Sequence, residues 1–180
     1  MRARSHGGGV PPGSRRLLPR PQSQSTRTTR WGGLKRMIIK LKIECVRGWR
    51  LKEKCVRIVA MDDAATLLDL HDMIQDAVDF DRDHPFDFYL ANSGAYLAER
   101  TPVVPDIEDW EEMADVFGTI HLRDLWPMGR KKLYYRFDFG DNWIFEIRKL
   151  RALKSDVDLQ PRQILERIGP NPEQYPLFEE

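Results

Sequence analysis

From Ile39 to Cys45, shortly after Met37, apolar and charged residues alternate strictly. The apolar residues occupy every second position, at Ile39, Leu41, Ile43 and Cys45. A two-residue period is typical of a strand with one buried and one solvated face. We expect a second strand at about residues 54–60, after a turn at Gly48, and we expect Trp49 to pack back over the sheet.

The spacing of apolar residues becomes helical after Thr66. Thr66 and Asp69 have the spacing of a short capping box at a helix start. The apolar stripe behind this cap consists of Leu67, Leu70, Ile74, Ala77 and Val78. His71 lies on or beside the stripe, where a hydrogen-bonded core histidine is favoured over a metal or substrate ligand. A polar turn then leads to a third strand with Phe86, Phe88 and Leu90 on one side.

The remaining segments carry weaker patterns. One short helix is expected around Ile107, Trp110, Met113 and Ala114, and a brief apolar element at Leu122 and Leu125. Near the C-terminus, Pro161 suits the first turn of a helix that ends at Gly169, with an apolar face of Ile164, Leu165 and Ile168. Residues 169–180 form a proline-rich strap, which either docks on its own domain or offers an edge to a partner.

The stretch LYYRFDFGDNW, residues 133–143, predicts an aromatic hairpin. If Phe139 pairs with Trp143 across a three-residue loop, Phe137 faces Phe145 and Tyr135 faces Ile147. The same register places Arg136 opposite Glu146, and Asn142 can adopt the left-handed conformation that such a loop needs.

The letters Asp-Phe-Gly within this hairpin also occur in protein kinases, but the glycine-rich loop and the H-R-D segment of a kinase are missing. A cation site is the alternative to a purely structural turn. Asp138 and Asp141 flank this turn, and Asp81, Asp83 and His84 flank another, so a divalent metal fits if the two turns meet in space.

Charge is unevenly distributed along the chain of 180 residues, whose net charge is +1. Residues 1–36 carry eight Arg, one Lys and no acid, which leaves 20 basic against 28 acidic residues from Met37 onward. An acidic domain is a poor binder of nucleic-acid phosphates. We interpret residues 1–36 as a disordered basic extension: a nucleic-acid-binding tail, an organelle transit peptide or, as we favour, sequence upstream of a mis-assigned start.

Composition fits one domain in the cytoplasm. Hydrophobic residues make up 41% of the chain, enough for one core, and no apolar run is long enough to span a membrane or resemble a secretory signal. Cys45 and Cys55 lack the further ligands of a zinc site, so we expect free thiols in or near the core, although a hairpin could bring the two together.

Two motifs together resemble the plasmid-encoded Orf-three-like (pRiA-type) family, which includes passenger proteins of insertion elements that are labelled transposon resolvases. These motifs are TLLDLHDMIQDAVDFDRDHPFDFYL and LYYRFDFGDNWIFEI. The matching positions are Leu70, His71, His84, Phe88, residues 138–141 and Trp143. Of the family's I-W-R-R strand motif, residues 54–57 keep only Arg57. The histidine often found two residues after the hairpin tryptophan is Phe145 here.

This resemblance implies a single α+β domain over residues 37–168, with a mixed sheet built from hairpins, a helix packed across it and a β-grasp-like arrangement. It implies no settled activity. The resolvase label does not fit the residues, because Ser93 and Ser155 have no arginine-rich setting and Tyr134 and Tyr135 fit strand packing.

Three functions therefore compete. The favoured one is a non-enzymatic interaction or accessory module that needs no cofactor and binds a protein partner rather than a membrane. The second is a metal-dependent hydrolase or nuclease that uses Asp138, Asp141 and His84 as metal ligands, with Asp83 as a possible fourth. The third is nucleic-acid binding through residues 1–36. The candidate functional residues are His71, His84, Asp138 and Asp141.

Overall fold

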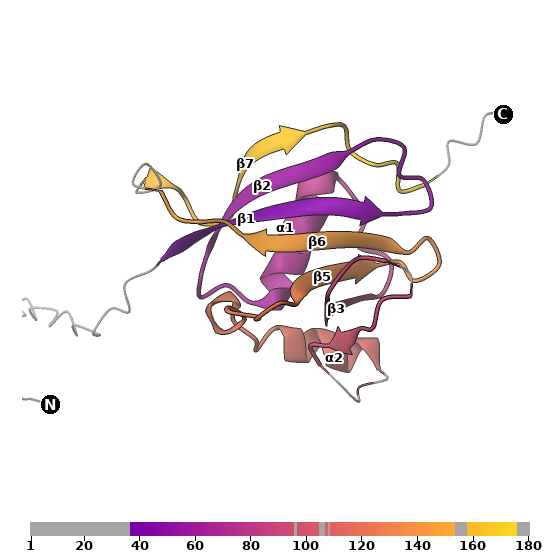
Figure 1. Ribbon diagram of the computed structural model, residues 1–180, viewed down its shortest axis with the longest axis horizontal. Helices are drawn as coiled ribbons and strands as arrows, with labels where there is room; N and C mark the ends of the chain where they lie inside the picture. The colour runs from indigo at the N-terminus through magenta and orange to yellow at the C-terminus, as the bar shows by residue number, and fades with distance from the viewer. Residues whose placement is uncertain (1–36, 96, 105–106, 108, 154–157, 176–180) are drawn as a thin grey trace, which may run out of the picture. The chain divides into compact units, whose positions relative to one another are not determined.

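The computed structural model describes residues 37–95, 97–104, 107, 109–153 and 158–175. The prediction of a disordered basic extension at residues 1–36 falls outside this described part of the chain. The described residues form a seven-stranded sheet with the order β4-β3-β5-β6-β1-β2-β7 (Figure 1). Its strands are β1 Ile38–Arg47, β2 Cys55–Asp62, β3 Phe86–Ala91, β4 Thr101–Pro102, β5 Lys132–Phe137, β6 Trp143–Lys149 and β7 Gln163–Ile168.

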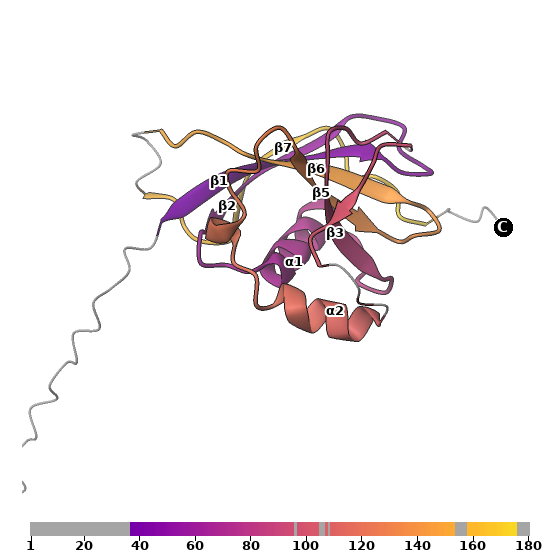
Figure 2. The same ribbon diagram turned by 60° about the horizontal axis from the view of Figure 1, so that its bottom comes forward.

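Two helices, α1 Leu67–Val78 and α2 Trp110–Phe117, lie on the same face of this sheet (Figure 2). A short 3-10 helix, Leu122–Asp124, follows α2. The α+β class is thus confirmed, and so are the first three strands, α1 and the short helix at α2. All strand pairs are antiparallel, where we expected a mixed sheet, and the β-grasp-like arrangement is not confirmed.

Helix α1 begins where the sequence predicted. The Thr66 hydroxyl accepts a hydrogen bond from the Asp69 amide, and the Asp69 carboxylate accepts one from the Thr66 amide, which completes the capping box. The helix ends at Asp79, which has the left-handed conformation. Its apolar stripe faces the sheet, so α1 forms the second layer of the core.

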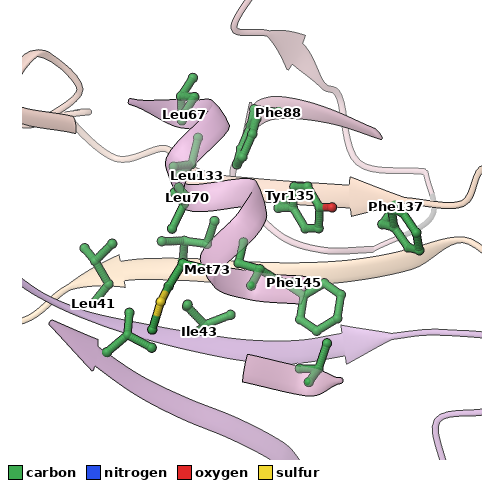
Figure 3. Close-up of a cluster of buried hydrophobic side chains, with 14 of the residues drawn as sticks. Leu41, Ile43, Leu67, Leu70, Met73, Phe88, Leu133, Tyr135, Phe137 and Phe145 are labelled. Carbon is green, nitrogen blue, oxygen red and sulfur yellow. The ribbon is translucent and has the colours of Figure 1, made fainter. Parts of the chain in front are cut away.

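The main core lies between α1 and the inward face of the sheet, and Figure 3 shows part of it. Alternate residues of β1, β2, β3, β5 and β6 point into this layer, as a period of two requires. Fully buried members include Leu41 and Ile43 from β1, Leu133, Tyr135 and Phe137 from β5, Trp143 and Phe145 from β6, and Leu67, Leu70 and Ile74 from α1. A smaller buried cluster of Tyr89, Ala91, Tyr134 and Ile144 lies on the opposite, outer face of the sheet.

The segment at residues 163–168 is a strand, so the predicted C-terminal helix is wrong. β7 pairs antiparallel with β2, with a register shift between Ile58 and Val59. Six residues with three apolar positions are too few to distinguish a helical from a strand period. The segment forms a strand because it pairs with main-chain groups of β2 that would otherwise be unpaired. Gly169 ends β7 with a φ of 78°.

Candidate functional site

Three of the candidate residues, His84, Asp138 and Asp141, lie at one end of the sheet, where four connecting segments meet. The β1–β2 loop (48–54) and the β5–β6 turn (138–142) both lie at the right-hand end in Figure 1, and the strap at 169–175 passes beside them. The Trp49 amide donates a hydrogen bond to the Asp141 carbonyl at 2.9 Å, and the Asp138 amide donates one to the Pro85 carbonyl at 3.1 Å. The α1–β3 turn at residues 79–85 is therefore the fourth segment.

The β5–β6 hairpin exists, but its predicted register is wrong by two residues. Phe137, not Phe139, pairs with Trp143, so the turn contains five residues. Asp138 leaves the strand with a φ of 51°, and its carboxylate accepts hydrogen bonds from the amides of Gly140 (2.9 Å) and Asp141 (3.2 Å). Asn142 has the predicted left-handed conformation, with a φ of 53°. A shift of two residues keeps every side chain on its predicted face.

The predicted pair of Arg136 with Glu146 is also wrong. Arg136 instead binds Asp87 of the neighbouring β3 through two hydrogen bonds. Glu146 is buried on the outer face, where Tyr134 donates to it at 2.8 Å and Lys132 at 2.9 Å, and Arg148 also contacts it. Although burial opposes ionisation, these three donors lower the pKa of Glu146.

The two acidic turns do meet, and they bring some of the proposed metal ligands together. His84 Nε2 lies 3.7 Å from an oxygen of Asp138 and 3.7 Å from an oxygen of Asp83. Asp141 faces elsewhere, with its carboxylate 3.5 Å from Arg50. In the part of the chain that the structure describes, His, Cys, Asp and Glu side chains form no group of three or more arranged to hold a metal ion.

The strap docks on its own domain over residues 169–175. Gln174 is buried and forms a two-way hydrogen bond with the main chain of Asp81, at 2.6 and 3.1 Å. The Tyr175 hydroxyl donates to the Asp83 carboxylate, which lowers the pKa of Asp83. Arg50 donates to the Gln174 carbonyl at 3.1 Å. One of the acidic candidates, Asp83, is thus occupied by the strap.

His71 belongs to a buried polar cluster inside the core. Its Nδ1 lies 2.6 Å from the Tyr135 hydroxyl, to which Gln75 also donates a hydrogen bond at 2.7 Å. The imidazole stacks on Phe86, with ring centroids 3.8 Å apart. Burial lowers the pKa of His71 to about 4, so the ring is neutral at physiological pH. The hydrogen-bonded core histidine expected from the sequence is the arrangement found.

Arg57 is a buried arginine whose role the sequence did not reveal. It is 1% exposed and donates to the carbonyls of Ala77 (2.8 Å), Val56 (2.8 Å) and Ile168 (3.2 Å) and to the Asn171 amide oxygen (2.6 Å). These bonds join β2 to the end of α1 and to the strap. The positive charge at the C-terminal end of α1 also suits the helix dipole. The arginine kept from the family's strand motif is therefore structural.

The position predicted for the Trp49 side chain is wrong. The sequence predicted that it packs over the sheet, but its side chain is 79% exposed. Gly48 explains why, because its main chain rests on the buried Trp143 ring, where an added Cβ would lie 2.0 Å from a ring atom. The position under the loop is thus already filled. Trp49 instead borders a shallow groove lined by Arg47, Gly48, Trp49 and residues 140–142.

The two cysteines are direct cross-strand partners in β1 and β2, and both are buried free thiols. Burial is the main reason why the pKa of each thiol is raised. Neither sits in the groove beside Trp49. The described residues include no helix that is both long enough and apolar enough to cross a membrane.

Comparisons with known proteins place the chain in a family. A crystal structure of a protein of unknown function, MM3350 from Methanosarcina mazei Go1, is similar with a TM-score of 0.52 and 20% identity, over 73% of this chain and 69% of that one. This similarity shows a shared fold. The comparison with curated proteins gave no match. The family model described as plasmid pRiA4b ORF-3-like protein matches residues 38–173. The chain therefore belongs to the family of plasmid pRiA4b ORF-3-like proteins.

Proposed function

We propose that this protein is a non-enzymatic interaction module that binds another protein through the surface around Trp49. The exposure of Trp49 carries this proposal. A tryptophan buries about 200 Å² or more when it is covered, and leaving it in water forgoes that stabilisation. Here 79% of the residue is exposed, on a loop that the described residues of the domain leave uncovered.

The loop presents this ring on a firmly held main chain. The hydrogen bond from the Trp49 amide to the Asp141 carbonyl ties the β1–β2 loop to the β5–β6 turn. Within the loop, the Leu51 amide donates to the Gly48 carbonyl at 3.1 Å. The close contact between Gly48 and Trp143 leaves little room for the loop to shift. A rigid exposed tryptophan beside a groove has the character of an interface hot spot, since little conformational entropy is lost on binding.

Selection of peptides on the folded protein tests the proposal. A random peptide display library is selected on the immobilised full chain and then on Trp49→Ala. We expect a shared motif that binds the wild type at least tenfold more tightly than Trp49→Ala. Met37→Ala is the matched control, because Met37 is also exposed, at 54%, but lies at the opposite end of β1. If no motif emerges, or if Trp49→Ala binds it equally well, the proposal fails.

The metal-dependent hydrolase or nuclease remains the alternative, supported by the proximity of His84 to Asp138 and Asp83. Calorimetric titration with Mg²⁺, Mn²⁺ and Zn²⁺ distinguishes the two proposals. The interaction module predicts no saturable heat. Saturable heat that disappears in His84→Ala supports the hydrolase instead. A cytoplasmic location and an association with mobile genetic elements are parts of the same proposal.

A further inference from the structure

A second surface feature adjoins the groove beside Trp49. It is a shallow pocket lined by Arg100, Arg136, Phe139 and Asn142. Asn142 also lines the groove, so the two features are neighbours on the surface. The pocket lies on the outer face of the sheet, where Arg100 covers Tyr89, a member of the outer cluster.

The charges in this pocket are only partly neutralised. Arg136 is held in place by Asp87, which offsets one positive charge, and its guanidinium lies 4.0 Å from the centroid of the Phe139 ring. The Arg100 guanidinium has no hydrogen bond or ion pair with any other described residue. Its guanidinium lies over the Tyr89 ring, 4.7 Å from the centroid. The pocket therefore carries an excess of positive charge, with one guanidinium whose donors are not used by the described residues.

Tyr89 lies beneath the Arg100 guanidinium on the outer face of the sheet. This residue is 2% exposed, and its buried hydroxyl lacks a hydrogen-bond partner among the described residues. Such a group costs about 1 to 3 kcal/mol unless something binds it. Burial raises the pKa of Tyr89, while the nearby charges of Arg100 and Arg136 oppose this rise. Tyr89 is not one of the residues that line the pocket, so its part is to hold the Arg100 guanidinium over its ring.

We infer that the pocket between Arg100 and Arg136 binds an oxyanion, a carboxylate or a phosphate group, carried by the protein partner that docks on Trp49. Guanidinium groups bind both kinds of oxyanion through paired hydrogen bonds. Asn142 offers further polar atoms, and the exposed Phe139 ring forms an apolar wall beside the charge. The partner segment thus combines an apolar side chain at Trp49 with an acidic group next to it. This assignment of partner chemistry rests on the proposed function.

Titration with inorganic phosphate and with acetate tests the pocket without any partner. Both anions are added to the full chain at constant ionic strength, and amide resonances are followed by NMR. We expect saturable shifts at Arg100, Arg136 and residues 139–142. Arg100→Gln removes the uncompensated charge and should weaken binding at least tenfold. Arg151→Gln loses the same charge at an exposed position outside the pocket and should remain within twofold of the wild type.

The inference is wrong if the shifts do not saturate or if Arg100→Gln binds as well as the wild type. Tighter binding of phosphate indicates a phosphorylated partner, and tighter binding of acetate indicates an acidic side chain, so either order supports an oxyanion site. Trp49→Ala should bind both anions normally. Failure of the peptide selection alone would therefore remove the proposed function and leave the anion pocket, whereas failure of the anion titration alone would remove only the pocket.

Discussion

The buried histidine provides a quantitative test of the distinction between a structural and a functional residue. His71 is 6% exposed, contacts the Tyr135 hydroxyl and stacks on Phe86. Burial lowers its pKa from 6.5 to about 4. Since the unfolded chain binds a proton at this residue at a higher pH than the folded protein, stability is fully present above pH 6.5. It is lost progressively as the pH falls from 6.5 to about 4.

The magnitude follows from proton linkage. At pH 5 the unfolded chain is almost fully protonated at His71, whereas the folded protein is almost unprotonated there. The free energy of unfolding should therefore fall by about 2 kcal/mol between pH 7.5 and pH 5, and by about 3 kcal/mol once the pH reaches 4. His71→Gln cannot take up this proton, so this part of the pH dependence disappears. Its overall stability is lower than that of the wild type because the contacts of the imidazole with Tyr135 and Phe86 are lost.

Urea unfolding at pH 7.5, 6 and 5 measures this effect in the wild type, His71→Gln and His84→Gln. The last variant is the control, because His84 lies at the surface with 36% of its side chain exposed. We expect only His71→Gln to lose about 2 kcal/mol of pH dependence. NMR titration of the His71 ring in the wild type provides a second readout that does not depend on the variant folding. A midpoint near 6.5, or an unchanged slope in His71→Gln, would refute the reasoning.

Three further predictions concern a close main-chain contact, a buried arginine and the two buried thiols. Gly169→Ala should lower the free energy of unfolding by about 3 kcal/mol or more, because its φ is 78° and the new Cβ would lie 1.8 Å from a main-chain oxygen. Gly129→Ala, with a φ of 65° but open space around it, should cost only about 1 kcal/mol; equal losses in urea unfolding would contradict this. Arg57→Lys should lower the free energy of unfolding by about 3 kcal/mol in the same assay, since one ammonium cannot reach acceptors on three segments. Wild-type stability of this variant would show that the guanidinium does not hold the three segments together. Cys45 and Cys55 should react with a disulfide reagent about tenfold or more slowly in the native state than in urea, because both thiols are buried with raised pKa values; rapid native reaction would show that β1 and β2 open readily.

The sequence correctly predicted those helices and strands that are determined by residues within a single segment. Helix α1 follows from its stripe and from the Thr66–Asp69 cap, which are both complete within one segment. The first strands follow from a period of two, which assigns each side chain to a face before any partner strand is known. The hairpin register failed because the turn depends on the Asp138 side chain, which closes a five-residue loop that alternation alone does not reveal.

By itself, therefore, the sequence determined the helix cap, the faces of the strands and the burial of His71, since these depend on spacing and side-chain chemistry within single segments. The α+β class followed from the resemblance of two sequence motifs to a known family. Only the tertiary structure decided that residues 163–168 pair with β2, that Trp49 is exposed, and that Arg100 and Arg136 share a pocket. Each of these depends on which distant segment fills the space beside a residue, and local periodicity carries no information about that.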